Sequence, residues 1–564
     1  MKKSGLLQWV LLAVLPLFVA CNIEKDGDDG VINSLVFKVD FADFNAEEEI
    51  GVSRSTQKEP KLEDQIVDLG NDVLALVSLK RDTACVTEQS NTRALSDDTY
   101  TMLVYNHDTH EYKGAVVGKV EHGAFLPAMR GLSIPAGNYD FVLFNSKVKR
   151  SGNILTVARA DANKAFLGRT TQAIGAERSN KFIAFTLKHA WCKIRVRLTG
   201  FMSFGAMSAN VQSVNANSVP EKTIYDASTG AYISGSGSAF SANTAFPNSS
   251  PLGSKAFTSL GNAEMLLPAQ TDVSTLKLVF TSGSMFSKNI AGVTCAFRPR
   301  TPLKLEANGA YVLNVRFLYG FYYLLDNGAV GRLDQTIYGG GTRKPIALVV
   351  SRSNRLAVAL ENASANKMIW CHPKYIWKGE MMNPLNTHVS IEQHGNQIAP
   401  TIWGALKARG ADETWRADYS TGYVQGNKVK GLNPEFYAFY AAAHYRPSVP
   451  YTGGNLSWHL PSTSDWQKLV LLGRAHDYAD GYDYHGLVRC FWDSKLVAVA
   501  FRQVDAELTY GWDEYCSSTE YVPLIYGQPD TRHCYVAVQF FDAEVNWKYF
   551  LIEWGSNIRP FVNY

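Results

Sequence analysis

Strict alternation of polar and apolar residues is the feature that most constrains the fold of this chain. Residues 193–198 read Lys-Ile-Arg-Val-Arg-Leu, so every second side chain is apolar. A period of two places the apolar side chains on one face of a β-strand, against a core, and the charged ones in water. Residues 183–187 and 311–317 alternate in the same way, and helical periodicity is scarce before residue 325. We therefore expect a mainly β fold in this part of the chain.

A short motif recurs at the start of two predicted strands. Gly137-Asn138-Tyr139 leads into residues 141–144, and Gly309-Ala310-Tyr311 leads into residues 313–317. Glycine supplies backbone conformations that other residues resist, and tyrosine is common at the start of strands. The two occurrences predict two tandem β-sandwiches, each closed by this strand. Residues 203–220 and 234–250 are rich in Ser, Ala, Asn and Gly and are predicted to be long loops.

The N-terminus has the features of an export signal. Two lysines precede residues 5–20, which are apolar apart from Gln8, and this predicts a secretory signal over residues 1–20. Residues 17–21 read Leu-Phe-Val-Ala-Cys, which resembles a bacterial lipobox and implies lipidation of Cys21. The acidic residues 22–29 resemble the surface-export signal of Bacteroidetes lipoproteins. These resemblances imply a lipid anchor at the cell outer membrane, the alternative being an ordinary signal peptide with an incidental cysteine.

A family resemblance covers roughly residues 31–325. Residues 185–190, Phe-Thr-Leu-Lys-His-Ala, followed by the alternating strand, resemble the strand that joins the two domains of Bacteroidetes fimbrillin-type pilins and their anchor and tip relatives. Residues 101–105 and the Gly137-x-Tyr139 strand fit the N-terminal domain of that group. The resemblance implies two transthyretin-like β-sandwiches, over residues 21–190 and 191–320, and assembly with other pilus subunits.

The same family implies a mechanism of assembly. Its polymerising subunits are trimmed after a basic residue, which frees a groove for a neighbour's strand. An open sheet edge can accept such a strand because it offers unpaired backbone groups. Arg54 and Arg93 lie in polar, loop-like sequence and are the candidate trimming sites. The alternative is that both are ordinary loop arginines.

The last third of the chain differs in composition. Ten of the twelve Trp lie between Trp370 and Trp554, and eight of the twelve His lie from His372 onward. The shift predicts a third domain over residues 321–564.

Three segments define the signature of this domain. The signature residues are Trp458, Pro461, Asp465 and Trp466 in the first segment, Ser518 and Glu520 in the second, and Arg559 in the third. In this order the segments resemble the Fibrobacter succinogenes major paralogous domain. Asp465 stands where that family has Glu, and Cys516 where it has Trp. The resemblance implies an α+β C-type-lectin-like fold, related to the formylglycine-generating-enzyme group, that commonly serves as an exposed binding module.

Most of the signature residues are predicted to be structural. Ser462 and Asp465 fit a helix capping box, and Trp458, Trp466 and Trp554 are expected in the core. Glu520 and Arg559 are predicted to form a buried ion pair.

Ligand contacts are expected instead in the aromatic stretch 372–451. Trp377, Trp403 and Trp415 are the candidate binding residues there, for a sugar ring or a protein partner. Gln528-Pro529-Asp530 matches the tripeptide of calcium-dependent galactose lectins, which makes Gln528 and Asp530 further candidates and Ca²⁺ a candidate ion. The accompanying Trp-Asn-Asp motif is absent, so a plain proline turn is the favoured interpretation.

Several function classes are disfavoured. Lys and Arg total 55 against 52 Asp and Glu, and the net charge of +3 gives no reason to expect nucleic acid. No zinc-protease, phosphate-loop or nucleophile-elbow motif indicates catalysis, and no cofactor or metal is expected apart from the calcium alternative. His107 and His110 are predicted in an exposed hairpin loop rather than at a metal. The eight Cys contain no C-x-x-C, and one bridge among Cys490, Cys516 and Cys534 is an open alternative.

The combined interpretation is a non-enzymatic surface lipoprotein that acts as a minor or tip fimbrial subunit, its last domain binding glycan or protein on a host or bacterial surface. The alternatives are a stand-alone glycan-binding lipoprotein for nutrient capture, and an enzyme on a formylglycine-generating-like fold.

Overall fold

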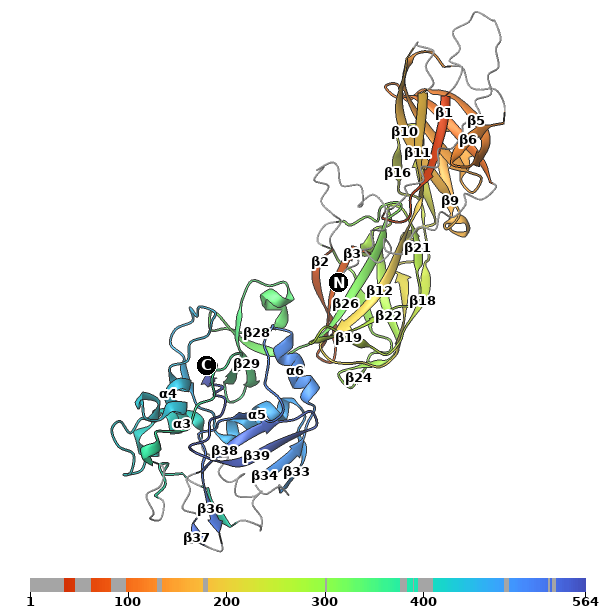
Figure 1. Cartoon of the computed structure of the whole chain (residues 1–564). Coiled ribbons are helices and arrows are strands. Elements are labelled where there is room, and N and C mark those ends of the chain that lie inside the picture. The colour runs from red at the N-terminus through yellow and green to blue at the C-terminus, as the bar shows by residue number, and fades with distance from the viewer. Residues whose placement is uncertain are drawn as a thin grey trace, which may run out of the picture.

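The computed structural model describes residues 35–45, 62–82, 98–128, 134–175, 181–299, 302–375, 383–388, 390–393, 409–480, 486–525, 528–529 and 534–564. These residues form three bodies in a row along an elongated molecule (Figure 1). The first two bodies are built of strands, and the third contains strands and helices. The mainly β fold expected from the alternating segments is confirmed.

The first body is a closed barrel of seven strands. In barrel order these are β1 (Leu35–Phe41), β11 (Lys181–His189), β10 (Phe166–Ile174), β7 (Gly137–Asn145), β4 (Thr99–Asn106), β5 (Tyr112–Glu121) and β6 (Ala124–Pro127). Apolar side chains fill its interior, among them Val39, Phe141 and Phe185. A transthyretin-like β-sandwich was predicted for this part. The barrel closes because β1 pairs in parallel with β11 on one side and antiparallel with β6 on the other.

The middle body is a β-sandwich. Its larger sheet contains β19 (Ser250–Leu252), β20 (Ala256–Leu260), β12 (Trp191–Gly200), β26 (Ala310–Tyr319), β3 (Val73–Arg81) and β2 (Leu62–Gly70), with β21 (Met265–Pro268) beside β12. The facing sheet contains β18 (Ser241–Phe246), β13 (Met207–Ser213), β22 (Leu276–Ser282) and β25 (Thr294–Ala296). Ile194, Val196 and Leu198 of the alternating segment enter the core with Val211 and Phe280 of the facing sheet.

Strand pairing differs from the sequence-based expectations in two places. Residues 62–82 were assigned to the first domain, but β3 pairs with β26 and so belongs to the middle body. Residues 203–220 and 234–250 were expected to be loops, yet they contain β13 and β18. In β13 the buried positions are Met207, Ala209 and Val211, an alternation that the small and polar residues between them obscure.

A small sheet connects the first two bodies. It contains β8 (Lys149–Ser151) and β9 (Ile154–Ala158), which follow a barrel strand, and β15 (Lys222–Asp226) and β16 (Ala231–Ile233), which come from the middle part. The pairing of β9 with β15 joins the barrel to the middle body through backbone hydrogen bonds. Two-stranded ribbons of β14 (Val219–Pro220) with β17 (Gly237–Ser238) and of β23 (Ser284–Met285) with β24 (Lys288–Asn289) complete this part.

In the part that the structure describes, the third body contains two sheets and four short α-helices. The first sheet comprises β28 (Val330–Arg332), β27 (Tyr322–Leu325), β29 (Pro345–Ser351), β30 (Leu356–Ala359), β40 (Phe561–Asn563) and β32 (Ser457–His459). The second comprises β31 (Ser390–Gln393), β36 (Glu520–Ile525), β38 (Cys534–Phe540), β39 (Glu544–Leu551), β34 (Gly486–Phe491), β33 (His476–Asp480), β35 (Glu514–Tyr515) and β37 (Gln528–Pro529). The helices are α3 (Gly410–Trp415), α4 (Tyr437–Ala443), α5 (Thr463–Leu472) and α6 (Ser494–Arg502).

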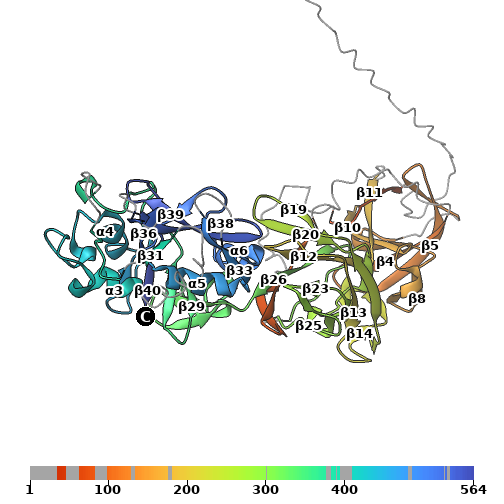
Figure 2. The same cartoon turned by 90° about the horizontal axis from the view of Figure 1, so that it is seen from below.

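Helix α6 lies at the junction of the middle and third bodies (Figure 2). Gln503, which follows α6, binds the end of β26 twice: its Nε2 donates to Tyr319 O at 3.0 Å, and its Oε1 accepts from Tyr319 N at 3.2 Å. Tyr323 donates its hydroxyl hydrogen to Ala500 O at 2.6 Å. The Gln503 bonds fix the third body against the middle one, and the Tyr323 bond holds α6 to β27 within the third body.

Candidate functional site

The first candidate site is the seam at which β1 closes the barrel. Leu35 to Phe41 pair in register with Lys181 to Leu187 of β11, and Phe37 and Lys38 also pair with β6. Phe37 and Val39 point into the barrel core. Because β1 is hydrogen-bonded on both sides, its removal would leave two unpaired strand edges above an apolar groove. Cys21, Arg54 and Arg93, named from the sequence, lie outside the described residues.

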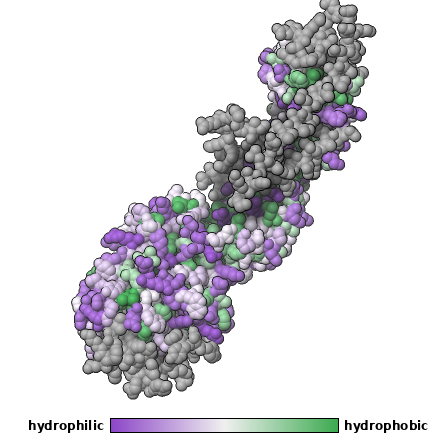
Figure 3. All heavy atoms as spheres, viewed as in Figure 1, coloured by the Kyte–Doolittle hydropathy of each residue, from purple (hydrophilic) through white to green (hydrophobic). Residues whose placement is uncertain are grey.

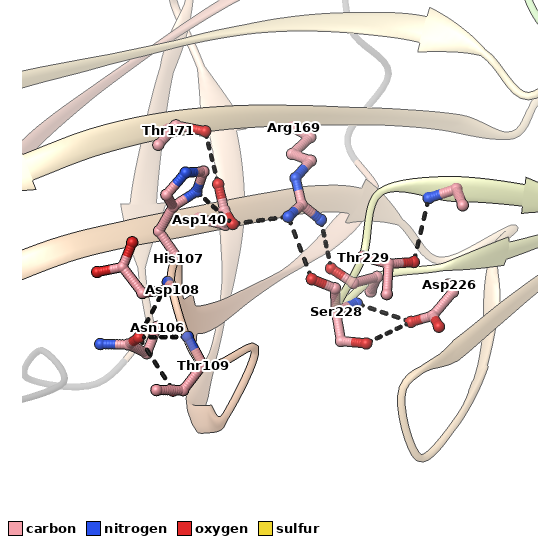
Figure 4. Close-up of polar contacts among 12 residues, drawn as sticks. Asn106, His107, Asp108, Thr109, Asp140, Arg169, Thr171, Asp226, Ser228 and Thr229 are labelled. Carbon is pink, nitrogen blue, oxygen red and sulfur yellow. Dashed lines mark hydrogen bonds and ion pairs between the residues drawn. The ribbon is translucent and has the colours of Figure 1, made fainter.

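A buried polar cluster links the barrel to the small connecting sheet (Figure 4). The carboxylate of Asp140 is fully buried and accepts hydrogen bonds from Thr171 Oγ1 at 2.5 Å and Arg169 Nη2 at 2.6 Å. His107 Nδ1 lies 3.0 Å from the same carboxylate. Arg169 also donates to the carbonyls of Ala227 at 2.7 Å and Ser228 at 3.2 Å, in the turn that follows β15.

This arrangement explains the charge state of Asp140. Burial alone would raise the pKa of its carboxyl, but the hydrogen bonds from Thr171 and His107 and the charge of Arg169 hold the pKa below its usual value. The cluster fastens two bodies together, and His107 serves it from an exposed hairpin, as expected for this residue. Among the residues that the structure describes, no group of His, Cys, Asp and Glu is arranged to hold a metal ion.

The signature residues of the third body are buried and connect separate segments. Asp465 and Ser462 form the predicted capping box of α5. Asp465 Oδ2 also accepts from Gly410 N at 3.0 Å, at the start of α3. Trp466 is fully buried and donates its indole hydrogen to Cys516 O at 3.1 Å, and Pro461 O accepts from Ser518 N at 2.8 Å. The signature therefore acts as a framework that holds α5 to the segment before β36.

The predicted ion pair between Glu520 and Arg559 does not form. Arg559 donates to Ala359 O at 3.3 Å and to Glu507 O at 2.9 Å, and its cation lies over the ring of Tyr515. Glu520 accepts from Leu385 N at 2.9 Å and from Asn386 N at 2.6 Å instead. Each buried charge thus finds main-chain partners in a different segment, although Nε of Arg559 keeps no hydrogen-bond partner among the described residues.

The predicted aromatic ligand contacts have different outcomes. Trp415 is half-buried and donates its indole hydrogen to Trp458 O at 2.9 Å, so it supports the fold around buried Trp458. Trp377, Trp403 and Asp530 lie outside the described residues. Gln528 is in β37 and pairs with Ile525. Trp554 was expected in the core. It lies at the surface instead, 41% exposed, with its ring against that of Phe550.

Sequence reasoning missed the most exposed tryptophan of the described residues. Trp512 is 77% exposed, with the ring of Phe541 edge-on at 5.5 Å and Lys548 Nζ 5.6 Å from its centroid. Lys367 Nζ binds the neighbouring Asp513 carboxylate at 2.8 Å. Trp512 stands between Gly511 and Asp513, two residue types that are common in turns, and this was the sequence signal for an exposed position. Elsewhere the visible surface of the third body is largely hydrophilic, with scattered hydrophobic residues (Figure 3).

The cysteines do not form the bridge left open by the sequence. Cys490, Cys516 and Cys534 are all buried and form no disulfide with one another. Burial raises the pKa of Cys192, Cys295 and Cys490 to about 12, which disfavours thiolate chemistry at these positions. No helix in the described ranges is long and apolar enough to cross a bilayer.

Comparison with known proteins gives matches at the level of structure. No model of a known protein family matches the sequence, and a search of curated proteins finds no match. A structure described as a cell adhesion protein from Bacteroides ovatus aligns over 50% of this chain and 92% of its own, with 13% identity and a TM-score of 0.26. A cell adhesion protein from Bacteroides uniformis aligns over 51% of this chain and 94% of its own, with 13% identity and a TM-score of 0.26. A fimbrial protein from Bacteroides vulgatus aligns over 42% and 93%, with 10% identity and a TM-score of 0.26. The chain is thus similar in structure to Bacteroides cell adhesion and fimbrial proteins, and the similarity covers only part of its backbone.

Proposed function

We propose that the chain is a surface adhesin that serves as a minor or tip subunit of a pilus, attached to the outer membrane by a lipid on Cys21. The observation that carries this proposal is the position of β1, a first strand seated between two barrel strands. In this proposal the barrel and the middle body are the fimbrillin-like modules, and the third body is a C-type-lectin-like binding domain.

The two candidate trimming sites would have different consequences. A cut after Arg54 releases β1 alone and opens the groove between β11 and β6. A cut after Arg93 leaves β1 joined to β2 and β3 and separates all three from the chain that follows, but β2 and β3 pair within the middle sheet through β26. Arg54 is therefore the trimming site in our proposal, since cleavage there leaves the middle body intact.

The opened groove would accept a strand from a neighbouring subunit. The backbone groups of β11 and β6 provide the hydrogen bonds, and the pockets left by Phe37 and Val39 select apolar side chains at alternate positions. This is β-strand addition, and it requires no covalent chemistry.

The third body supplies the binding surface in our proposal. The exposed ring of Trp512 offers an apolar face, and the Asp513 carboxylate and the Lys367 ammonium beside it offer hydrogen-bond acceptors and donors. A pyranose presents the matching combination of a C–H face and hydroxyl groups. We therefore assign glycan binding to this surface.

Strand exchange is tested by limited cleavage of the full chain with an arginine-specific protease. We expect the wild type and Arg93→Gln to lose β1 and form oligomers, and Arg54→Gln to remain uncut there and monomeric by light scattering. A peptide of residues 35–45 added in excess should block oligomers, and a scrambled peptide should not. A cleaved chain that stays monomeric without added peptide would contradict the pilus role and favour stand-alone glycan capture.

Glycan binding is tested separately on an array with the full chain. Trp512→Ala should lose binding, and the control Trp554→Ala, at a second exposed tryptophan, should keep it. Equal binding by both variants would refute the assignment to Trp512 without bearing on strand exchange.

A further inference from the structure

A cavity of about 580 Å³ lies where the connecting sheet meets the middle body. Its walls come from the end of β9 and the following 3-10 turn η2 (Arg159–Asp161), from the start of β15, and from β17 and β18. Ala158 pairs with Lys222 in the sheet, and Glu221 N donates to Ser236 O, so the walls are held by backbone hydrogen bonds. This size falls within the range of roughly 300–1,000 Å³ that is typical of small-molecule sites.

Arg159 lines this cavity with an unused guanidinium. Its Nη2 is buried and has no hydrogen-bond partner, and within the described part of the chain the side chain makes no hydrogen bond or ion pair. The cation lies 4.9 Å from the ring centroid of Phe240 and 6.0 Å from that of buried Trp191. The two rings therefore hold the guanidinium in place, and no described group accepts a hydrogen bond from it.

The other polar residues around the cavity narrow the chemistry of that ligand. Lys222 adds a second positive charge, and Ser238 and Ser241 add hydroxyl groups. A planar guanidinium with free donors fits a carboxylate in a two-point hydrogen bond. Among the described residues that line the cavity, Glu221 alone is acidic, and its carboxylate can accept hydrogen bonds from ligand hydroxyls. The lining therefore suits a ligand with one carboxylate and several hydroxyl groups.

We infer that this cavity binds a carboxylate-bearing sugar unit, with its carboxylate on Arg159 and its hydroxyls toward Glu221 and the serines. This site is separate from Trp512 and from the barrel seam, and it would operate whether or not the chain assembles into a pilus.

Burial lowers the pKa of Arg159, against the opposing effect of Glu221, which agrees with a cation that lacks a close anionic partner. A bound carboxylate would supply that partner.

The test is titration of the full chain with D-glucuronate, followed by calorimetry or ligand-observed NMR. We expect Arg159→Gln to weaken binding at least tenfold, and Glu221→Gln to strengthen it a few-fold by removing a repulsive charge. Arg150→Gln is the matched control: this arginine also lies over an aromatic ring, Tyr112, at 4.7 Å, but it does not line the cavity. Circular dichroism and melting temperatures establish that each variant is folded.

Two further probes distinguish the source of the anion. D-Glucose should not bind, because it lacks the carboxylate, and inorganic phosphate or acetate should bind more weakly than glucuronate. Binding of phosphate as strong as that of glucuronate would overturn the sugar assignment. Unchanged glucuronate binding in a folded Arg159→Gln variant, or no binding by the wild type, would overturn the site.

Discussion

The ring of Tyr311 lies against Gly309 so closely that a Cβ added to this glycine would sit 2.7 Å from the ring. The hydroxyl of Tyr311 accepts a hydrogen bond from Glu306 N at 3.0 Å, which holds the ring over the turn. Tyr139 repeats the arrangement in the barrel, where its hydroxyl donates to Pro135 O at 2.9 Å. The Gly-x-Tyr motif is thus a tyrosine packed over a glycine at the start of a strand.

Gly309→Ala is therefore expected to destabilise the middle body by about 1–3 kcal/mol, as overpacking does. Tyr311 is fully buried and cannot move aside. Urea unfolding followed by circular dichroism measures the change. Gly205→Ala is the control, because a Cβ there meets no atom within 4 Å, and it should change stability by less than about 1 kcal/mol. Equal effects of the two substitutions would refute the packing role of Gly309.

Asp140→Asn should weaken the link between the barrel and the connecting sheet. The substitution removes the charge that Arg169 binds, and loss of such a charged hydrogen bond costs about 1.5–3 kcal/mol. Because the pKa of Asp140 is lowered in the folded protein, its stabilisation is present at neutral pH and is lost as the pH falls below about 4. Asp140→Asn should flatten that acid loss in thermal melts, whereas Asp40→Asn, at an exposed position, should leave it unchanged.

Glu413 provides the opposite pH dependence. Burial raises the pKa of this fully buried carboxyl to about 8. The folded protein then keeps a proton that the unfolded chain releases above about 4.5, so stability should fall as the pH rises from about 4.5 to about 8. Glu413→Gln should reduce that fall by about 1 kcal/mol or more in urea unfolding at a series of pH values.

The effect of Glu413 can be separated from that of its buried neighbour Lys430 and from that of an exposed carboxylate. Lys430 is also buried, and burial lowers its pKa to about 8, so its own contribution changes mainly above pH 8. Glu553→Gln, at an exposed carboxylate in the same body, is the control. A stability profile between pH 5 and 8 that is identical in the wild type and Glu413→Gln would contradict a protonated Glu413.

Gln503→Ala should loosen the junction between the middle and third bodies. It leaves the backbone N–H of Tyr319 without the Gln503 acceptor, at a cost of about 1–3 kcal/mol, while the Tyr319 C=O keeps its bond from Phe321 N. Hydrogen exchange at Tyr319 should accelerate. Gln467→Ala, at a half-exposed position on α5, should not change it. Unaltered exchange in Gln503→Ala would mean that packing alone holds the junction.

The sequence predicts those elements whose signal is local. The strands β11, β12 and β26 were expected because polar and apolar residues alternate along them, and β7 because it follows a Gly-x-Tyr turn. The capping box of α5 follows from Ser462 and Asp465. Closure of the barrel leaves no such signal, since Leu35 pairs with Lys181 across most of the first two hundred residues.

The partners of buried charges were equally hidden. Glu520 and Arg559 are both buried, as expected, but their partners are backbone groups of segments 385–386, 359 and 507. Spacing along the chain does not determine which segment approaches a charge in space. Arg159 and Trp512, the residues argued to bind ligands, were missed because exposure and a vacant donor are properties of the folded surface.

The position of β1 also determines when the barrel can close. Its residues are the first of the barrel to be synthesised, but their partner β11 comes near the end of the barrel sequence, so closure has to await that late segment. Until then the apolar side chains of β1 require protection from aggregation. A strand that joins last is also a natural place for local opening. The seam is therefore the last part of the barrel to close during folding and the part that opens most easily afterwards.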